Sequence, residues 1–170
     1  MESGLPLVRI DALSPLVPTL AGWAHDQWGH LHPGRSRAAT IATFRADCGS
    51  QGVPSVFAAM DGERPVGMAS LVADDMSDRR ELTPWLASVF VLPEWRGRGI
   101  ASALVRRVEQ EAEDGGHELF YLYTPDQQSL YRQLGWEDLE EREYHGETVT
   151  IMRRDLSPRG PVPSAAARPV

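Results

Sequence analysis

The distribution of apolar and polar positions predicts a domain in which strands and helices follow one another along the chain. Short runs rich in apolar and β-branched side chains indicate strands, and apolar residues spaced by three and four indicate helices. Strands are expected at residues 7–10, 54–60, 65–73, 85–92, 119–124, 136–144 and 147–153. Helices are expected at residues 15–28, 36–47, 101–114 and 127–134. This order predicts an α/β (α+β) fold around one mixed sheet.

Turn residues separate several of these elements. The Asp-Gly pair at 61–62 and the His-Gly pair at 145–146 predict two tight hairpins, because glycine adopts positive φ without a steric penalty. The acidic segment 74–82 is expected to be a flexible loop between two strands.

Polar residues predict the ends and the faces of the helices. Ser14 is expected to cap the first helix, and Asp126 is expected to cap the last one. On the helix at 101–114, apolar residues form one stripe and charged residues, Glu111 among them, are expected on the solvent face.

The end of the chain has a different composition. From residue 157 onward Pro, Ala, Ser and Arg dominate without periodicity, which predicts a disordered tail. The chain is therefore expected to form a single domain over residues 1–156, followed by a tail over residues 157–170.

The overall composition excludes several classes of protein. No apolar run approaches the roughly 20 residues of a membrane span, and the N-terminus lacks the pattern of a signal peptide. The net charge of −7 disfavours nucleic-acid binding, which needs a surplus of positive contacts to phosphate. The single cysteine, Cys48, excludes an internal disulfide framework and a multi-cysteine zinc site. We therefore expect a cytoplasmic protein with neither a membrane nor a nucleic-acid partner.

The junction between the strand at 85–92 and the helix at 101–114 has the composition of an anion site. It reads Arg-Gly-Arg-Gly-Ile-Ala over residues 96–101. Gly97 and Gly99 permit positive φ and remove two side chains, so backbone N–H groups can converge where the helix presents its unpaired donors. A diphosphate fits such a site.

Two familiar phosphate-binding loops do not match this junction. A P-loop needs a lysine followed by Ser or Thr, whereas Ile100 and Ala101 follow the last glycine and the chain has no lysine. A dinucleotide-binding fold needs Gly-x-Gly-x-x-Gly after the first strand, whereas this loop lies in mid-chain and Ser102 takes the place of the third glycine.

The remaining pattern, Arg-x-x-Gly-x-Ala at Arg96, Gly99 and Ala101, resembles the signature of the GNAT family of N-acetyltransferases. The sequence Ser-Leu-Tyr-Arg-Gln-Leu-Gly-Trp-Glu at 129–137 resembles a second family signature. The resemblance covers roughly residues 7–155. It implies the GNAT fold, with a mixed, mostly antiparallel sheet of about seven strands and about four helices, and acetyl-CoA as the co-substrate.

The resemblance also implies roles for individual residues. Tyr131 corresponds to a tyrosine that faces the sulfur of the coenzyme and protonates the departing thiolate. A backbone N–H near Phe90 or Val91 would polarise the acetyl carbonyl. The residues expected to bind the coenzyme are Phe90, Val91, Arg96, Gly97, Arg98, Gly99, Ile100 and Ala101.

The acceptor side is less defined, because the strand glutamate that serves many relatives as the base is absent from residues 85–88. Ser88 could only order a water. The other candidate bases are His25, Asp26, Asp75, Asp78 and Glu81. The residues expected to border the acceptor are Trp28, Trp85 and Tyr144.

A cluster of aromatic and imidazole side chains lies early in the chain. Trp23 falls on the apolar stripe of the first helix and is expected in the core. Contacts of His25, His30 and His32 with the acceptor stay open. His30 and His32 have no carboxylate or cysteine at ligand spacing, so no metal is expected.

The sequence thus predicts an acetyl-CoA-dependent N-acetyltransferase that acts on a primary amine by direct attack in a ternary complex. The alternatives are a coenzyme-binding sensor or partner module that has lost turnover, and an acetyltransferase directed to nucleic acid, which the acidic charge disfavours. The identity of the amine stays open. Homodimers are common in the family, and no feature of the sequence decides the oligomeric state.

Overall fold

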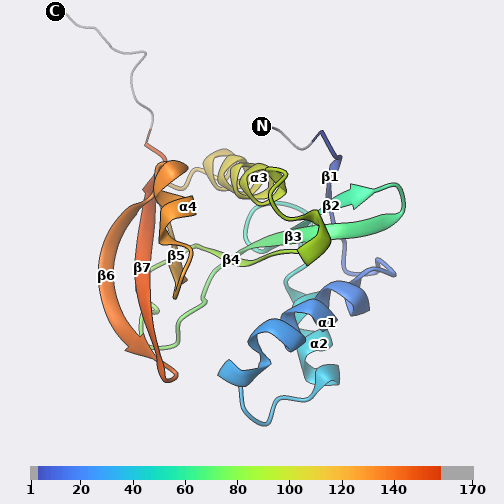
Figure 1. The fold of residues 1–170 in the computed structure, drawn as a ribbon, viewed down its shortest axis with the longest axis horizontal. Helices are drawn as coiled ribbons and strands as arrows, with labels where there is room; N and C mark the ends of the chain where they lie inside the picture. The colour runs from blue at the N-terminus through green and yellow to red at the C-terminus, as the bar shows by residue number, and fades with distance from the viewer. Residues whose placement is uncertain (1–3, 158–170) are drawn as a thin grey trace, which may run out of the picture.

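One seven-stranded sheet organises the protein. The computed structural model describes residues 4–157, and the strand order is β1-β2-β3-β4-β5-β7-β6 (Figure 1). The strands are β1 (Leu7–Arg9), β2 (Ser55–Asp61), β3 (Arg64–Val72), β4 (Trp85–Val91), β5 (Leu119–Thr124), β6 (Glu137–Tyr144) and β7 (Glu147–Asp155). All neighbouring strands are antiparallel except β4 and β5, which are parallel. The predicted mixed, mostly antiparallel sheet is confirmed.

Helices cover both faces of this sheet. The helices are α1 (Val17–Trp28), α2 (Arg37–Ala46), α3 (Ile100–Asp114) and α4 (Gln128–Gln133), with short 3₁₀ turns η1 (Gly29–Leu31) and η2 (Pro93–Trp95). Figure 1 shows α1 and α2 on one side of the sheet and α3 on the other. Side chains of β2 alternate accordingly, because Phe57 and Ala59 belong to the core cluster of α3 whereas Val56 and Ala58 belong to that of α1 and α2.

The two predicted helix caps are wrong. The Ser14 hydroxyl accepts a hydrogen bond from the backbone N–H of Leu16 (3.1 Å), and α1 begins only after Leu16. At α4 the side chain of Asp126 makes no cap, because the Thr124 hydroxyl accepts from the backbone N–H of Gln127 (3.0 Å) instead. In both places a nearby hydroxyl forms a turn that precedes the helix.

Glu111 is buried, which corrects its expected place on the solvent face of α3. Its carboxylate lies 2.8 Å from an Nη of Arg9 and 3.1 Å from an Nη of Arg107, and it accepts a hydrogen bond from the backbone N–H of Gly52 (2.6 Å). Both guanidinium groups also lie over the ring of Phe57. This ionic cluster joins α3 to β1, β2 and the loop that precedes β2.

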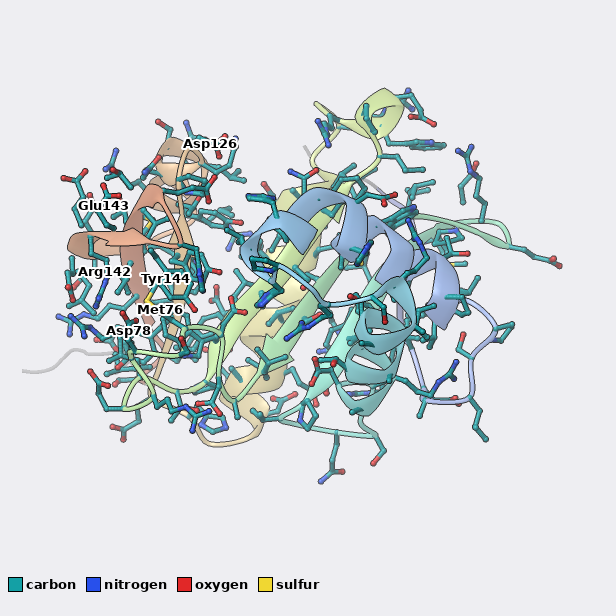
Figure 2. All side chains as sticks on the ribbon, turned by 90° about the horizontal axis from the view of Figure 1, so that it is seen from below. Met76, Asp78, Asp126, Arg142, Glu143 and Tyr144 are labelled. Carbon is teal, nitrogen blue, oxygen red and sulfur yellow. The ribbon has the colours of Figure 1, made fainter. Side chains whose placement is uncertain are left out.

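The loop between β3 and β4 is anchored, where the sequence suggested a free one. Arg142 donates to the Asp78 carboxylate (2.7 Å), and the hydroxyl of Tyr144 accepts from the backbone N–H of Ser77 (3.1 Å). Met76 in the same loop is buried in a core cluster against which Tyr144 packs. Figure 2 shows these loop residues beside the β6–β7 hairpin, so the hairpin fixes the position of the loop.

The last two expectations from the sequence concern the C-terminal tail and a membrane-spanning helix. Residues 158–170 of the predicted tail lie outside the described residues. Across residues 4–157, no helix combines the length and the apolar character that crossing a membrane requires.

Candidate active site

The sheet opens between its two parallel strands. β4 and β5 pair only at Trp85 and Tyr121, near the start of β4, and no pairing follows beyond that point. A cleft of about 950 Å³ occupies the opening. Its walls come from α1, η1, α2, the loop before β4, β4 itself, the start of α3, β5, α4 and the β6–β7 hairpin.

A bulge bends β4 where it lines the cleft. Two residues of β4, Ser88 and Val89, lie opposite the single residue Ala69 of β3. Ser88 has a φ of 55°, which is uncommon for a residue with a side chain. Such bulges increase the local bend of a strand, and this one accompanies the separation of β4 from β5.

The pairing of β4 with β3 decides which backbone donors face the cleft. Leu92 donates its N–H to the carbonyl of Val66 on β3 (2.9 Å). Because N–H groups alternate in direction along a strand, the N–H of Val91 points away from β3 and toward the cleft, whereas that of Phe90 points toward β3. Of the two backbone donors expected from the sequence, only Val91 is therefore aimed into the cleft. Phe90 also lines the cleft, and its ring packs against Trp23 and Trp28.

The loop that follows η2 exposes backbone N–H groups at the other end of the cleft. Gly97 and Gly99 have φ values of 78° and 80°. The first bond of α3 joins the N–H of Ala103 to the carbonyl of Gly99 (3.0 Å), so within the described chain the N–H groups of Ile100 and Ala101 have no acceptor. A Cβ at Gly97 would meet nothing within 4 Å. The loop can therefore receive an anion along its backbone.

The two arginines of the loop stabilise its conformation through contacts with neighbouring residues. Nε of Arg96 donates to the carbonyl of Val91 (2.9 Å), which ties the loop to the end of β4. The Arg98 guanidinium lies over the ring of Trp95 at 4.6 Å and donates to the carbonyl of Glu94 (3.3 Å). Arg96 lines the cleft, whereas Arg98 does not.

Tyr131 lies in the wall of the cleft on α4, and its side chain is 7% exposed. It packs edge-on against Trp136 with ring centroids 6.1 Å apart. Burial, with a smaller contribution from the Asp126 carboxylate, raises the pKa of Tyr131 above its ordinary value. Its hydroxyl therefore keeps its proton throughout the neutral range.

Two of the three aromatic residues expected near an acceptor lie in the wall of the cleft. Trp28 at the end of α1 and Tyr144 at the end of β6 both line it. Trp85 does not, because its side chain is fully buried and its Nε1 donates to the carbonyl of Leu82 (2.6 Å). The expectation for Trp85 is corrected accordingly.

The five candidate bases differ in whether they line the cleft and in whether an arginine pairs with them. Asp26 is paired with Arg37 (2.7 Å), Asp78 with Arg142, and Glu81 lies 4.0 Å from Arg79. None of these three carboxylates lines the cleft, whereas His25 and Asp75 do. His25 shares a 3.0 Å hydrogen bond with Thr40. Trp23 packs against Phe90 with centroids 5.4 Å apart and does not line the cleft, as expected for a core residue.

The structure adds Asp47 to the residues that the sequence singled out. It lies at the C-terminal cap of α2 and lines the cleft together with Asp75. Burial raises the pKa of Asp47 to about 6. Burial, with the Asp47 carboxylate as a second cause, raises the pKa of Asp75 to about 8. An aspartate at the end of a helix is unfavourable beside the helix dipole, and that signal could have identified Asp47 in the sequence.

The two remaining histidines of the early cluster also line the cleft. His30 lies 3.7 Å from the Glu147 carboxylate, and the His32 ring lies 6.2 Å from that of His145. These contacts connect η1 with the tip of the β6–β7 hairpin. No group of three or more His, Cys, Asp or Glu residues within residues 4–157 is placed to hold a metal ion.

The sequence and the fold are both similar to those of known proteins. A family model described as the acetyltransferase (GNAT) family matches residues 18–136, which include all of α1 but its first residue, the β4 bulge, the loop at 96–101 and Tyr131.

Solved structures of similar fold include several acetyltransferases. An aminoglycoside 6'-N-acetyltransferase complexed with coenzyme A is 15% identical, with a TM-score of 0.73 over 91% of this chain and 99% of that one. An aminoglycoside 6'-acetyltransferase type Ii is 17% identical, with a TM-score of 0.70 over 91% and 99% of the two chains. The protein yncA from Salmonella typhimurium, solved with its cofactor acetyl-CoA, is 17% identical, with a TM-score of 0.67 over 96% and 99%. At these identities the likeness concerns the fold.

Proposed function

This chain belongs to the GNAT acetyltransferase family, and from that premise we propose that it transfers an acetyl group from acetyl-CoA to the primary amine of an acceptor, by direct attack in a ternary complex. The observation that carries the proposal is the cleft between β4 and β5. It has free backbone donors of the loop 96–101 at one end, the Val91 N–H along one wall and Tyr131 in another.

The loop fits the diphosphate of the coenzyme. The exposed N–H groups of Ile100 and Ala101 lie at the positive end of the α3 dipole, which favours an anion. The side chain of Ile100 is buried, so this residue would contribute through its backbone. Bound acetyl-CoA supplies a thioester whose carbonyl carbon accepts the amine and whose thiol departs.

The walls of the cleft provide two further functions. The Val91 N–H would donate to the carbonyl oxygen of the acetyl group and stabilise the negative charge that develops on it. Tyr131 keeps its proton because it is buried, so its hydroxyl can protonate the departing sulfur. Arg96 holds the loop in place through the carbonyl of Val91.

We further propose that residues 1–156 act as one catalytic domain in the cytoplasm. A single sheet runs through all seven strands of the described chain, and its two faces carry the helices that line the cleft. Fractionation of cells that produce the tagged protein would locate it.

Binding of acetyl-CoA tests the proposal directly. Gly97→Ala is expected to weaken the Kd for acetyl-CoA about tenfold, because a side chain at positive φ strains the loop and obstructs the approach of the diphosphate to the backbone. The measurement is isothermal titration calorimetry with acetyl-CoA.

The matched control is Gly62→Ala in the β2–β3 hairpin. Gly62 has a φ of 62° and open space around its Cβ position, so the backbone strain is similar but the site is elsewhere. Its Kd is expected to stay within about twofold of the unchanged protein. Absence of acetyl-CoA binding by the unchanged protein would refute the proposed function.

A further inference from the structure

The acceptor side of the cleft contains two half-buried carboxylates without a partner. Within residues 4–157 the side chains of Asp47 and Asp75 have no hydrogen bond and no ion pair, although both line the cleft and both are half-buried. Of the other acidic groups nearby, Asp26 is paired with Arg37, Asp78 with Arg142 and Glu147 with His30. Asp74 also lines the cleft, but it is exposed to solvent.

The positions of these two carboxylates are electrostatically unfavourable. Burial removes water from both, and the Asp47 carboxylate disfavours the charge of Asp75. Asp47 also lies at the C-terminus of α2, where the helix dipole repels a negative charge. A bound cation would offset the desolvation, the repulsion between the carboxylates and the effect of the helix dipole, because it would supply the positive charge that both carboxylates lack.

The surrounding walls suit such a cation. Trp28, Tyr123 and Tyr144 line the same cleft, and the rings of Tyr123 and Tyr144 pack edge-on with centroids 5.4 Å apart. Aromatic faces attract ammonium groups. Tyr144 is fixed by its hydrogen bond with Ser77, two residues from Asp75, so the hairpin positions both the ring and the carboxylate.

We propose that the acceptor is a flexible cation with at least two amino groups, of which one gives its proton to Asp75 and is acetylated while another is held by Asp47. This inference rests on the proposed function and names the acceptor class for the same site. It also selects one base from the five that the sequence left open, because Asp75 is the unpaired carboxylate among them that lines the cleft.

The attacking ammonium gives one proton to the Asp75 carboxylate, and its neutral nitrogen forms a bond to the acetyl carbon while the carbon–sulfur bond breaks. The departing sulfur takes the proton of the Tyr131 hydroxyl, which regains one from the nitrogen. The products are the amide, the free thiol and a protonated Asp75, which releases its proton to water.

The elevated basicity of Asp75 agrees with this role. A carboxylate with a pKa of about 8 is a far stronger base than an ordinary aspartate and approaches the basicity of an amine. The other charged and titratable groups that line the cleft on this side are Asp47, Asp74, His25, His30, His32, Arg35, Arg80, Tyr123, Tyr144 and Glu147. No arginine lies within 4 Å of either unpaired carboxylate among the described residues, since neither forms an ion pair.

The experiment compares diaminobutane with butylamine as acceptors, with free thiol release as the readout. The unchanged protein is expected to show a kcat/KM for diaminobutane about tenfold above that for butylamine, since one carboxylate contact discriminates them. Asp47→Asn is expected to raise the KM for diaminobutane about tenfold more than that for butylamine, so that the preference for the diamine is lost. Asp75→Asn is expected to lower kcat for both amines about a hundredfold.

A stability measurement shows whether these variants act through the fold. A carboxylate whose pKa is raised by folding stabilises the protein below its unfolded pKa, and this contribution is lost as the pH rises through the folded value. Both asparagine variants are therefore expected to be at least as stable as the unchanged protein at pH 8. Asp61→Asn, on the exposed β2–β3 hairpin, is the matched control and is expected to change neither stability nor kinetics.

The possible outcomes separate this inference from the proposed function. If acetyl-CoA binds, any of four results would overturn the inference but leave the proposed function intact. These are an equal kcat/KM for the two amines, an Asp47→Asn effect of the same size on both amines, an undiminished kcat in Asp75→Asn, and a loss of stability in either variant. If acetyl-CoA does not bind in calorimetry, both the proposed function and this inference are refuted.

Discussion

Replacement of Tyr131 by phenylalanine is expected to lower kcat about a hundredfold and to leave the Kd for acetyl-CoA within about threefold. The change removes one hydroxyl from a side chain that is buried in the wall of the cleft. The ring keeps its packing against Trp136, so the fold and the coenzyme site stay intact. Only the proton for the departing sulfur is lost.

The measurements are steady-state thiol release and calorimetric titration of acetyl-CoA on the same protein. Because burial raises the pKa of Tyr131, its hydroxyl stays protonated and the rate of the unchanged protein is expected to show no loss from its ionisation up to pH 9. Tyr121→Phe is the matched control, since Tyr121 is buried on β5 but does not line the cleft. A rate for Tyr131→Phe equal to that of Tyr121→Phe would contradict the assignment.

Glu111→Gln is expected to lower the free energy of unfolding by about 3 kcal/mol, at the lower end of the range for a broken buried ion pair, because Arg9 and Arg107 stay partly exposed. The substitution keeps the shape of the side chain but leaves two guanidinium groups without their shared carboxylate. The melting temperature is expected to fall by about 6–12 °C.

The effect of this substitution depends on pH. Burial opposes ionisation of Glu111, but hydrogen bonds from Arg9 and from the Gly52 backbone outweigh it and lower its pKa. A carboxylate with a lowered pKa stabilises the protein above its unfolded pKa, and this contribution is lost as the pH falls through the folded value. The difference between Glu111→Gln and the unchanged protein is therefore expected to shrink in acid.

Urea denaturation at pH 7 and at pH 4 would measure both effects. Glu113→Gln on the exposed face of the same helix is the control, and its free energy of unfolding is expected to change by less than about 0.5 kcal/mol. If the two variants were equally stable at pH 7, the buried cluster would have no role in stability.

The sequence alone places Tyr131 correctly but not Glu111. Tyr131 follows Ser129 and Leu130 on a short predicted helix, and its position was readable from local spacing and from the family signature. For Glu111 the sequence predicts a solvent-facing residue, because its neighbours on α3 are charged. Its burial depends on Arg9 and Gly52, which approach from distant parts of the chain.

On the acceptor side of the cleft, too, the sequence proposes candidates and the folded structure distinguishes among them. The sequence offered five bases and no reason to choose among them, since pairing with arginine is a property of three dimensions. The structure removes Asp26 and Asp78 through their ion pairs, and it brings Asp47 beside Asp75 in one cleft. It also excludes Trp85, whose burial beneath the loop before β4 could not be read from its neighbours in the chain.

By itself, the sequence determined the features that depend on residues close together in the chain. These are the order of strands and helices, the two glycine hairpins, and the loop at 96–101 with its positive-φ glycines. Local sterics and periodicity set such features, so a short window contains the necessary information.

Only the tertiary structure decided the features that depend on distant segments. The bulge at Ser88, the direction of the Val91 N–H and the gap between β4 and β5 follow from strand pairing, which a single strand cannot specify. The burial and pairing of charges likewise depend on which segments pack together. Desolvation and Coulomb interactions act through space rather than along the chain, and for that reason the chemistry of Asp47 and Asp75 became visible only in the folded protein.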